Sequence, residues 1–338
     1  VVTLDGARWQ ELFLGVDRNL AQHDGVPSDE VVAASVLLPN IYERLIRRGV
    51  ALGAPGHGSP VEASGPVHVS LPGYRELFVG APDASCRSND CGAVTVPTMA
   101  DAIRERSARD QDVAVLSSWE TIERAATVGT GHIVVSTGRT TGLTRDLARV
   151  SPRASQILDQ GARADAWPGH DDYRPDRFTM PLALDYQLSA QPRFLFVGLG
   201  DTDEYAHRGD YRGYLGALRQ ADRFIGDLFA SLDRQGPDGA ATTVLVTADH
   251  GRARNFRDHG RDAESRRVFL LAAGGTVPAQ GYVDAGPGRR LASIAPTVRG
   301  LLGLPATEGA IDEPWVAVGL GAPWASPSGR VASRGAGR

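Results

Sequence analysis

The sequence predicts an α/β protein in which a largely parallel central sheet is flanked by helices. Three short runs of apolar, often β-branched residues are typical of buried parallel strands, namely VVTL (1–4), RFLFVGLG (193–200) and ATTVLVTA (241–248). Helical patterns lie between them, and strands that alternate with helices indicate a sheet covered on both faces. An Asp directly follows each run, at the strand ends where open α/β sheets bind ligands.

The remaining elements follow from similar patterns. DVAVLSS (112–118) and RVFLLAAG (267–274) have the composition of the first three strands. Helices are expected at 40–50 and 289–304, and the clearest one at 211–235. The apolar residues of this last segment recur mostly at three- and four-residue steps and define one helix face: Leu215, Leu218, Ile225, Leu228, Phe229 and Leu232.

Two segments lack such patterns. Residues from about 138 to 178 are rich in Gly, Arg, Asp and Pro without steady periodicity, which predicts a lid or a long surface excursion. The tail at 321–338 is predicted to be disordered. The total of 338 residues, 42% of them hydrophobic, allows one large domain or two small ones.

Charge and hydropathy exclude some classes of function. The net charge of −4 gives no electrostatic case for nucleic-acid binding. No apolar run approaches the roughly 18 residues that a membrane span needs. The chain opens within a predicted strand, and we therefore expect that a leader was removed.

The two cysteines, Cys86 and Cys91, stand in ASCRSNDCGA. A metal–thiolate site usually needs four such ligands or nearby histidines, and the CxxC spacing is absent. A short disulfide loop is favoured over two free thiols. Such a bond persists in oxidising compartments, which predicts a periplasmic or secreted protein.

Acidic residues and histidines gather where the three predicted strands end. Parallel strands bring their carboxyl ends to one edge of the sheet, so these side chains should meet there. The candidate ligands are Asp5, Asp203, His207, Asp249, His250 and His259. Asp203 and His207 are four residues apart, on one face of a helical turn. Carboxylate oxygen and imidazole nitrogen suit zinc and similar ions, which also relieve the repulsion among clustered carboxylates.

This ordered set, with Ser70 in VHVSLPGY, resembles the alkaline phosphatase superfamily. Within it, the pattern is similar to the two-metal phosphatase and nucleotide pyrophosphatase/phosphodiesterase branch. The likeness covers nearly the whole chain. Three segments carry it, namely LPNIYERLIRRGV, SIAPTVRGLLGL and, the most specific of them, TADHGR. The resemblance implies an alkaline phosphatase-like three-layer sandwich that forms a single catalytic domain over residues 1–320.

The resemblance also implies roles for these residues. One divalent ion would be held by Asp203, His207 and His259, and the other by Asp5, Asp249 and His250, with zinc expected first and manganese second. Ser70 matches the nucleophile of the family, although a serine before a turn is also typical of a helix N-cap. Asn89 lies 19 residues after Ser70 (89 − 70), near where diesterase-like relatives place a phosphoryl-binding Asn; a plain turn residue is the other interpretation.

The expected function is metal-dependent hydrolysis of a small phosphate ester through a phosphoserine on Ser70. A sulfatase is the nearest alternative, but its C/S-x-P-x-R motif needs Arg where Tyr74 stands, and Arg75 comes one residue late. A phosphoglycerate mutase of the same superfamily carries a large inserted domain for which this chain is short. A metal-free serine hydrolase would be expected to carry a G-x-S-x-G motif, which this sequence lacks. A non-catalytic relative usually lacks some of the metal ligands, whereas all six candidate ligands are present in this sequence.

The sequence leaves the substrate open. Monoesterases of the superfamily add Lys or Arg contacts to the phosphate, and Arg252, Arg254 or the arginines between 138 and 178 are candidates. Monoesterase and diesterase are therefore both retained, and the oligomeric state is not indicated.

Overall fold

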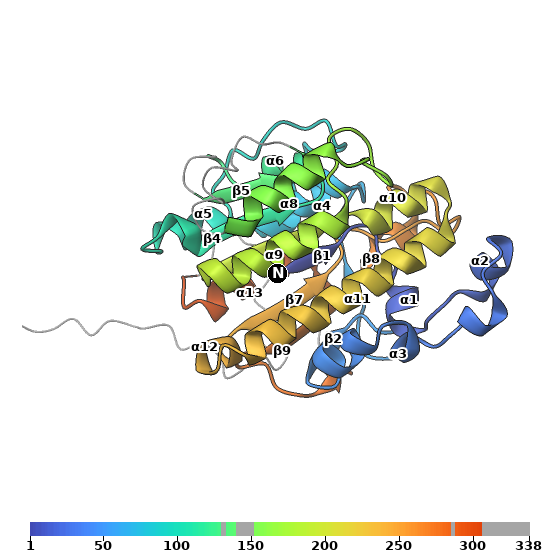
Figure 1. The fold of residues 1–338 in the computed structure, drawn as a ribbon. Coiled ribbons are helices and arrows are strands. Elements are labelled where there is room, and N and C mark those ends of the chain that lie inside the picture. Colours follow the sequence, from blue (N-terminus) through green and yellow to red (C-terminus); the bar gives the residue numbers. More distant parts are fainter. Residues whose placement is uncertain (130–132, 140–151, 285–287, 306–338) are drawn as a thin grey trace, which may run out of the picture.

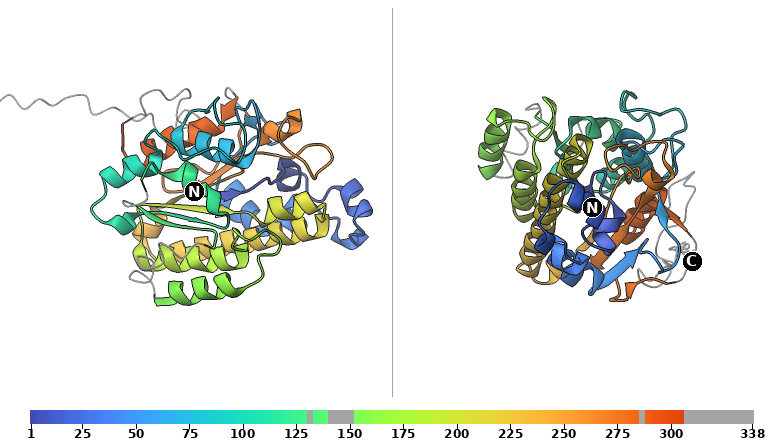
Figure 2. Two further views of the ribbon diagram at one scale, coloured as in Figure 1. Left: turned by 90° about the horizontal axis from the view of Figure 1, so that it is seen from above. Right: turned by 90° about the vertical axis from the view of Figure 1, so that its right-hand side faces the viewer.

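An eight-stranded sheet lies between two layers of helices in the computed structural model, which describes residues 1–129, 133–139, 152–284 and 288–305 (Figures 1 and 2). The strand order is β10-β2-β9-β7-β1-β6-β4-β5. The strands are β1 (Val2–Leu4), β2 (Gly49–Leu52), β4 (Val113–Ser117), β5 (Val134–Thr137), β6 (Phe194–Leu199), β7 (Thr243–Thr247), β9 (Leu270–Gly274) and β10 (Gly281–Tyr282). The predicted class, an α/β fold with a largely parallel sheet, is confirmed.

The centre of the sheet is formed by the three strands that the sequence marks most clearly. β1 pairs in parallel with β6 on one side and with β7 on the other. Every residue of β1 is buried, as expected for a central strand covered on both faces. The three predicted strand ends therefore lie side by side.

The strand predicted at 267–274 differs from the others. It is split into β8 (Arg267–Val268) and β9, and β9 runs antiparallel to both β7 and β2. β8 belongs to a second, three-stranded sheet with β3 (Val61–Glu62) and β11 (Arg289–Arg290). The expectation that this run is one parallel strand is therefore wrong, because an apolar run does not carry the direction of its pairing.

The helices cover the two faces of the sheet (Figure 2). On one face lie α4 (Ser70–Val79), α5 (Met99–Glu105), α6 (Glu123–Ala126) and α13 (Ile294–Leu301); on the other lie α8 (Pro152–Arg163), α9 (Asp176–Ala190) and α11 (Tyr211–Asp233). The six apolar residues that define one face of α11 are all buried, as predicted. This amphipathic helix therefore packs its apolar stripe onto the core.

The remaining short elements connect these layers. The helices are α1 (Trp9–Phe13), α2 (Arg18–His23), α3 (Ala34–Leu37), α10 (Asp201–Arg208) and α12 (Pro237–Ala240), with a π-helical segment at Ile41–Ile46. Single 3₁₀ turns occur at Ser28–Glu30, Asp110–Asp112, Glu120–Ile122, Ala263–Arg266 and Leu291–Ser293. No helix in the described ranges is both long and apolar enough to cross a membrane.

Two helix predictions need correction. The helix expected at 40–50 ends at Ile46, and its last predicted residues form β2 instead. Val50 pairs with Ala272 of β9, so long-range pairing decides the state of this segment. The helix expected at 289–304 begins only after β11 and a 3₁₀ turn.

The segment expected to be a lid or excursion, 138–178, lies partly outside the described residues, which omit 140–151. Its later part contains α8, a helix that packs against α9 and that the sequence analysis missed. Arg174 is buried and donates to the carbonyl of Ser117 at 2.8 Å, so this part of the segment packs onto the sheet. Movement as a lid stays a prediction, and the predicted tail at 321–338 lies outside the described residues.

Candidate active site

The carboxyl ends of β1, β6 and β7 bring the predicted metal-binding side chains together. Asp5 directly follows β1, and Asp249 and His250 follow β7. α10 starts two residues after β6 and carries Asp203 and His207 one turn apart. His259 comes from the loop after β7, and its ring centroid is 4.9 Å from that of His207. All six candidate ligands therefore lie in one cluster.

One ligand group is wholly buried. Nε2 of His250 is 3.6 Å from Oδ1 of Asp5 and 3.4 Å from Oδ2 of Asp249. The ligand atoms of these three residues all lie within 4.8 Å of one another. They are the three residues that the resemblance assigns to one ion.

The second group is more open to solvent. Nε2 of His207 lies 3.0 Å from Oδ2 of Asp203 and 3.0 Å from Nε2 of His259. A further set of ligand atoms within 4.8 Å joins Asp203, His259 and His250, so His250 lies between the two groups. The side chain of His207 is 44% exposed, so this group is open to solvent. The division of ligands between two ions stays a prediction.

Hydrogen bonds orient the ligands toward the centre of the cluster. Nδ1 of His250 lies 2.8 Å from the carbonyl of Gly251, and Nδ1 of His259 lies 3.0 Å from the carbonyl of His68. Each contact fixes one ring nitrogen and leaves Nε2 for a ligand role, as is usual for metal-binding histidines. Oδ1 of Asp249 accepts from the backbone N–H of Gly6 at 3.1 Å. Oδ2 of Asp249 is buried and has no hydrogen-bond partner among the described residues.

The charges of the cluster fit bound cations. Burial and the charges of Asp249 and Asp203 raise the pKa of Asp5 well above its usual range, and burial and Asp203 raise the pKa of Asp249 to about 8. The pKa of Asp203, in contrast, lies well below its usual range. Burial by itself would raise this pKa, but the Arg252 guanidinium and His207 outweigh the effect of burial. Burial lowers the pKa of His250, which keeps its imidazole neutral. Buried carboxylates, the neutral imidazole of His250 and an oxygen of Asp249 without a hydrogen bond form a donor set suited to divalent ions.

Two residues around Asp203 were not found by the sequence analysis in these roles. Gly6 has φ = +57°, and a Cβ there would lie 2.3 Å from Oδ1 of Asp203, so both the backbone conformation and the space require glycine. Arg252 is buried and donates to Asp203 and to the carbonyls of Phe256 and Arg257. Arg252 therefore holds Asp203, and its contact with the phosphate stays a prediction.

Ser70 is the first residue of α4 and is buried beside the ligand cluster. Its Oγ lies 3.1 Å from Nε2 of His250 and 3.4 Å from Oδ1 of Asp5. The N-cap position belongs to Val69, and the helix has no side-chain cap. The N-cap interpretation of Ser70 is therefore wrong, and its hydroxyl faces the candidate ligands.

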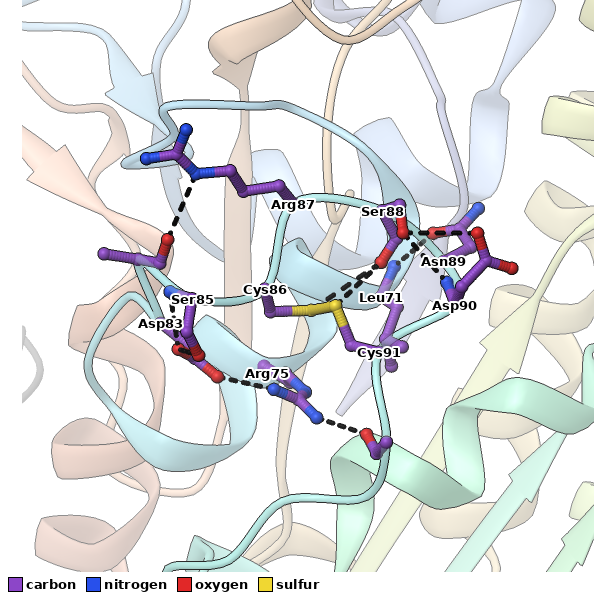
Figure 3. Close-up of a disulfide and its surroundings, with 12 residues drawn as sticks. Leu71, Arg75, Asp83, Ser85, Cys86, Arg87, Ser88, Asn89, Asp90 and Cys91 are labelled. Carbon is purple, nitrogen blue, oxygen red and sulfur yellow. Dashed lines mark hydrogen bonds and ion pairs between the residues drawn. A yellow bond between two sulfur atoms is a disulfide. The ribbon is translucent and has the colours of Figure 1, made fainter.

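Asn89 reaches the same helix end from the disulfide loop (Figure 3). Its Oδ1 accepts from the backbone N–H of Leu71 at 2.9 Å, one residue beyond Ser70. Cys86 and Cys91 form the predicted disulfide and enclose Asn89 between them. Arg75 of α4 donates to Asp83 and to the carbonyl of Gly92, on either side of this loop (Figure 3). Asn89 is thus held next to the candidate nucleophile, and its contact with a phosphoryl oxygen stays a prediction.

Tyr74 is a further residue of the site that sequence reasoning does not identify. In the sequence it stands where a sulfatase motif requires Arg. Its buried hydroxyl donates to Oδ2 of Asp5 at 2.9 Å. The available signal was its spacing, because a residue four positions after Ser70 shares its helix face.

Comparisons with solved structures agree with this architecture. A putative sulfatase from Bacteroides thetaiotaomicron is similar with a TM-score of 0.62 and 12% identity, covering 96% of this chain and 75% of that one. A protein of the alkaline phosphatase superfamily from Vibrio parahaemolyticus gives a TM-score of 0.57 at 12% identity, covering 93% and 68%. A variant of the alkaline phosphatase PafA gives 0.59 at 12% identity, covering 94% and 98%. The chain therefore shares the fold of these three proteins.

Similarity in sequence covers a shorter part of this chain. Residues 180–306 match the model of the Metalloenzyme superfamily. Phosphopentomutase of Symbiobacterium thermophilum is 35% identical over 118 residues, which are 35% of this chain and 28% of that enzyme. The 2,3-bisphosphoglycerate-independent phosphoglycerate mutase of Rippkaea orientalis is 31% identical over 120 residues, 33% of this chain and 22% of that enzyme. The chain therefore aligns with under a third of the length of these curated relatives.

Proposed function

We propose that this protein hydrolyses small phosphate esters and that Ser70 is the attacking group. The observation that carries the proposal is the position of the Ser70 hydroxyl, buried at the start of α4 and within 3.4 Å of both Asp5 and His250. A serine needs activation to attack at neutral pH. Here the hydroxyl lies against the same carboxylate and imidazole that would hold a cation.

Two divalent ions would complete this site, most simply zinc, with manganese as second choice. Asp203, His207 and His259 would hold one, and Asp5, Asp249 and His250 the other. When bound, such ions lower the pKa of a hydroxyl or water and neutralise charge on phosphoryl oxygens.

The residues of the chain then have distinct tasks. Ser70 Oγ attacks phosphorus in line, and a Ser–phosphate bond forms while the bond to the leaving oxygen breaks. Oδ1 of Asn89 is held by the N–H of Leu71, so the amide nitrogen of Asn89 is the atom left to donate to a phosphoryl oxygen. Water then attacks the phosphoserine, breaks the Ser70–phosphate bond and releases phosphate. The exposed side at His207 admits the ester and the water.

A phosphomutase is the second candidate, because the curated relatives that match part of the chain are mutases. A mutase would pass the phosphoryl group to another oxygen of the substrate and not to water. A sulfatase is the third candidate, because sulfatases are among the similar structures. Tyr74 disfavours it, because its hydroxyl contacts Asp5 at the position where the sulfatase motif needs Arg.

One set of assays separates these candidates. Metal-loaded protein is offered p-nitrophenyl phosphate, bis-p-nitrophenyl phosphate and p-nitrophenyl sulfate, and ³¹P NMR follows a pentose phosphate. We expect release of p-nitrophenolate, with inorganic phosphate as the second product of the monoester and p-nitrophenyl phosphate as the second product of the diester. The ratio of these two rates identifies the preferred ester. Dominant sulfate release, or isomerised sugar phosphate without free phosphate, would contradict the proposal.

A matched pair of variants links that activity to the site. Asp203→Ala removes a candidate ligand and should lower both metal content and turnover. Asp227→Ala removes an exposed acid on α11 and should change neither. Equal activity of the two variants would exclude Asp203 from the active site.

We also propose a periplasmic or secreted location, supported by the Cys86–Cys91 disulfide. Thiol labelling of protein from its native compartment tests it. Two reactive thiols there would contradict it.

A further inference from the structure

Tyr74 lies directly behind the candidate nucleophile. It occupies the fourth position after Ser70 on α4 and is completely buried. Its ring packs edge-on against Phe196 of β6, with centroids 6.1 Å apart and planes at 83°. The ring alone is therefore an ordinary part of the core, and the hydroxyl group requires a separate explanation.

The hydroxyl of Tyr74 connects α4 to the end of β1. It donates to Oδ2 of Asp5 at 2.9 Å and lies 3.4 Å from Oγ1 of Thr3. A phenol has a single proton, and the shorter distance assigns it to Asp5. Thr3 can then donate to the phenol oxygen. Both contacts are buried, so no solvent replaces either of them.

This bond decides which oxygen of Asp5 faces the candidate site. With Oδ2 held by Tyr74, Oδ1 is the oxygen near Nε2 of His250, at 3.6 Å, and near Oγ of Ser70, at 3.4 Å. Asp249 shows the same division, because Gly6 holds its Oδ1 while its Oδ2 is buried without a hydrogen-bond partner. Each carboxylate thus has one oxygen occupied by the protein and one directed to the centre.

We propose that Tyr74 is a positioning residue that restricts Asp5 to a single coordinating oxygen and sets that oxygen beside Ser70. The inference rests on the proposed function, because it concerns the ligand and nucleophile named there. Ser70 and Tyr74 share a helix face, so the same helix carries the nucleophile and orients the ligand next to it. Without the phenol proton, nothing holds Oδ2, so the Asp5 carboxylate can turn and Oδ1 is no longer kept beside Ser70.

The test compares two conservative variants. Tyr74→Phe keeps the packed ring and removes only the hydroxyl. Tyr186→Phe is the matched control, because Tyr186 is equally buried but its hydroxyl donates to the carbonyl of Gln111, before β4 at the opposite end of the sheet. Zinc affinity is measured without substrate by competition with a chromogenic chelator, and Asp5→Asn identifies which ion depends on Asp5.

The expected results are specific to one ion. Wild type and Tyr186→Phe should bind two zinc ions with equal affinities. Tyr74→Phe should bind the Asp5-dependent ion roughly 10- to 100-fold more weakly, the usual effect of losing a group that orients a ligand, and leave the other ion unchanged. Turnover of this variant should require correspondingly more zinc, while the KM at saturating zinc changes little.

Two different failures can be told apart. If Tyr74→Phe binds both ions within twofold of wild type while Asp5→Asn loses one, Tyr74 does not position Asp5 and the metal centre stands. If Asp5→Asn also binds both ions like wild type, the ligand assignment and the proposed function are wrong.

Discussion

Gly73→Ala should displace the helix that carries Ser70. Gly73 lies on the face of α4 that meets the ligand-bearing loop after β7, and a Cβ there would be 2.5 Å from the carbonyl oxygen of Asp249. Ordinary contacts of a Cβ begin at about 3.4 Å, so the two segments must separate by nearly 1 Å. The added Cβ and the carbonyl oxygen of Asp249 are both fixed by the backbone, so no side-chain rotation can relieve the clash.

The size of the effect follows from this displacement. Overpacking of a buried contact costs about 1–3 kcal/mol, and the better helix propensity of alanine returns about 0.5–1 kcal/mol. We expect a net loss of about 1–2 kcal/mol in the free energy of unfolding, which leaves the protein folded. Turnover should fall more sharply, by about 100-fold, because a 1 Å misplacement of a reacting group has that order of effect.

The assay combines urea unfolding with turnover of the best phosphate ester. Gly216→Ala is the control, since Gly216 lies within α11 and nothing lies within 4 Å of its added Cβ. This control should gain about 0.5–1 kcal/mol of stability and keep wild-type turnover. If Gly73→Ala behaves like Gly216→Ala, α4 is not seated against Asp249 as described, and the reasoning is refuted.

Two further predictions concern the loop and the metal-free state. Reduction of the Cys86–Cys91 disulfide, or the substitution Asn89→Ala, should lower turnover at least tenfold and leave the metal content unchanged. Activity that returns on reoxidation would confirm that the loop positions Asn89. Full activity of the reduced protein would contradict it. Chelator-treated protein should lose stability as the pH rises from about 6.5 to 8, because burial and the charge of Asp203 raise the folded-state pKa of Asp249 to about 8. Over that range the carboxyl is ionised in the unfolded chain but resists ionisation in the folded one. Below about 6.5, the lowered pKa values of His250 and His259 act in the opposite direction. Zinc should remove this slope in urea unfolding, and equal slopes with and without zinc would exclude Asp249 as a ligand.

Much of the site could be predicted because strand ends and helical spacing are local properties. Asp5 and Asp249 follow apolar runs that become the neighbouring strands β1 and β7. Asp203 and His207 needed only the four-residue step of one helical turn. The strand or helix to which each of these residues belongs decides its position, so local sequence patterns are sufficient to predict it.

Other features could not be predicted because distant segments decide them. β2 forms where a helix was expected, since Val50 finds a partner in β9 more than 200 residues away. Arg252 is drawn to Asp203 by a buried cluster that exists only in the folded chain. The bond from Tyr74 to Asp5 likewise joins two elements whose distance in space is set by the sheet and the packing of α4.

The family model matches only some of the residues that form the proposed active site. The matched residues, 180–306, include the candidate ligands on α10 and after β7. They include neither Ser70 nor Asn89, the residues that would act on the phosphoryl group. The identity of the attacking group is thus the point at which hydrolase, mutase and metal-bound-water mechanisms diverge, and it lies outside the residues that match the family model.

Acid quenching of a single turnover tests the role of Ser70 most directly. Metal-loaded wild type is mixed with a labelled phosphate ester, quenched within milliseconds to seconds, digested and analysed by mass spectrometry. We expect phosphate on Ser70 in the peptide that contains VHVSLPGY, and none in Ser70→Ala. This variant should still bind both ions through the six candidate ligands but turn over at least 100-fold more slowly. Ser70→Thr should keep partial activity, because the hydroxyl survives with one added methyl group. If Ser70→Ala instead hydrolyses the ester at near wild-type rate and no phosphopeptide forms, water is the attacking group and the proposed mechanism is contradicted.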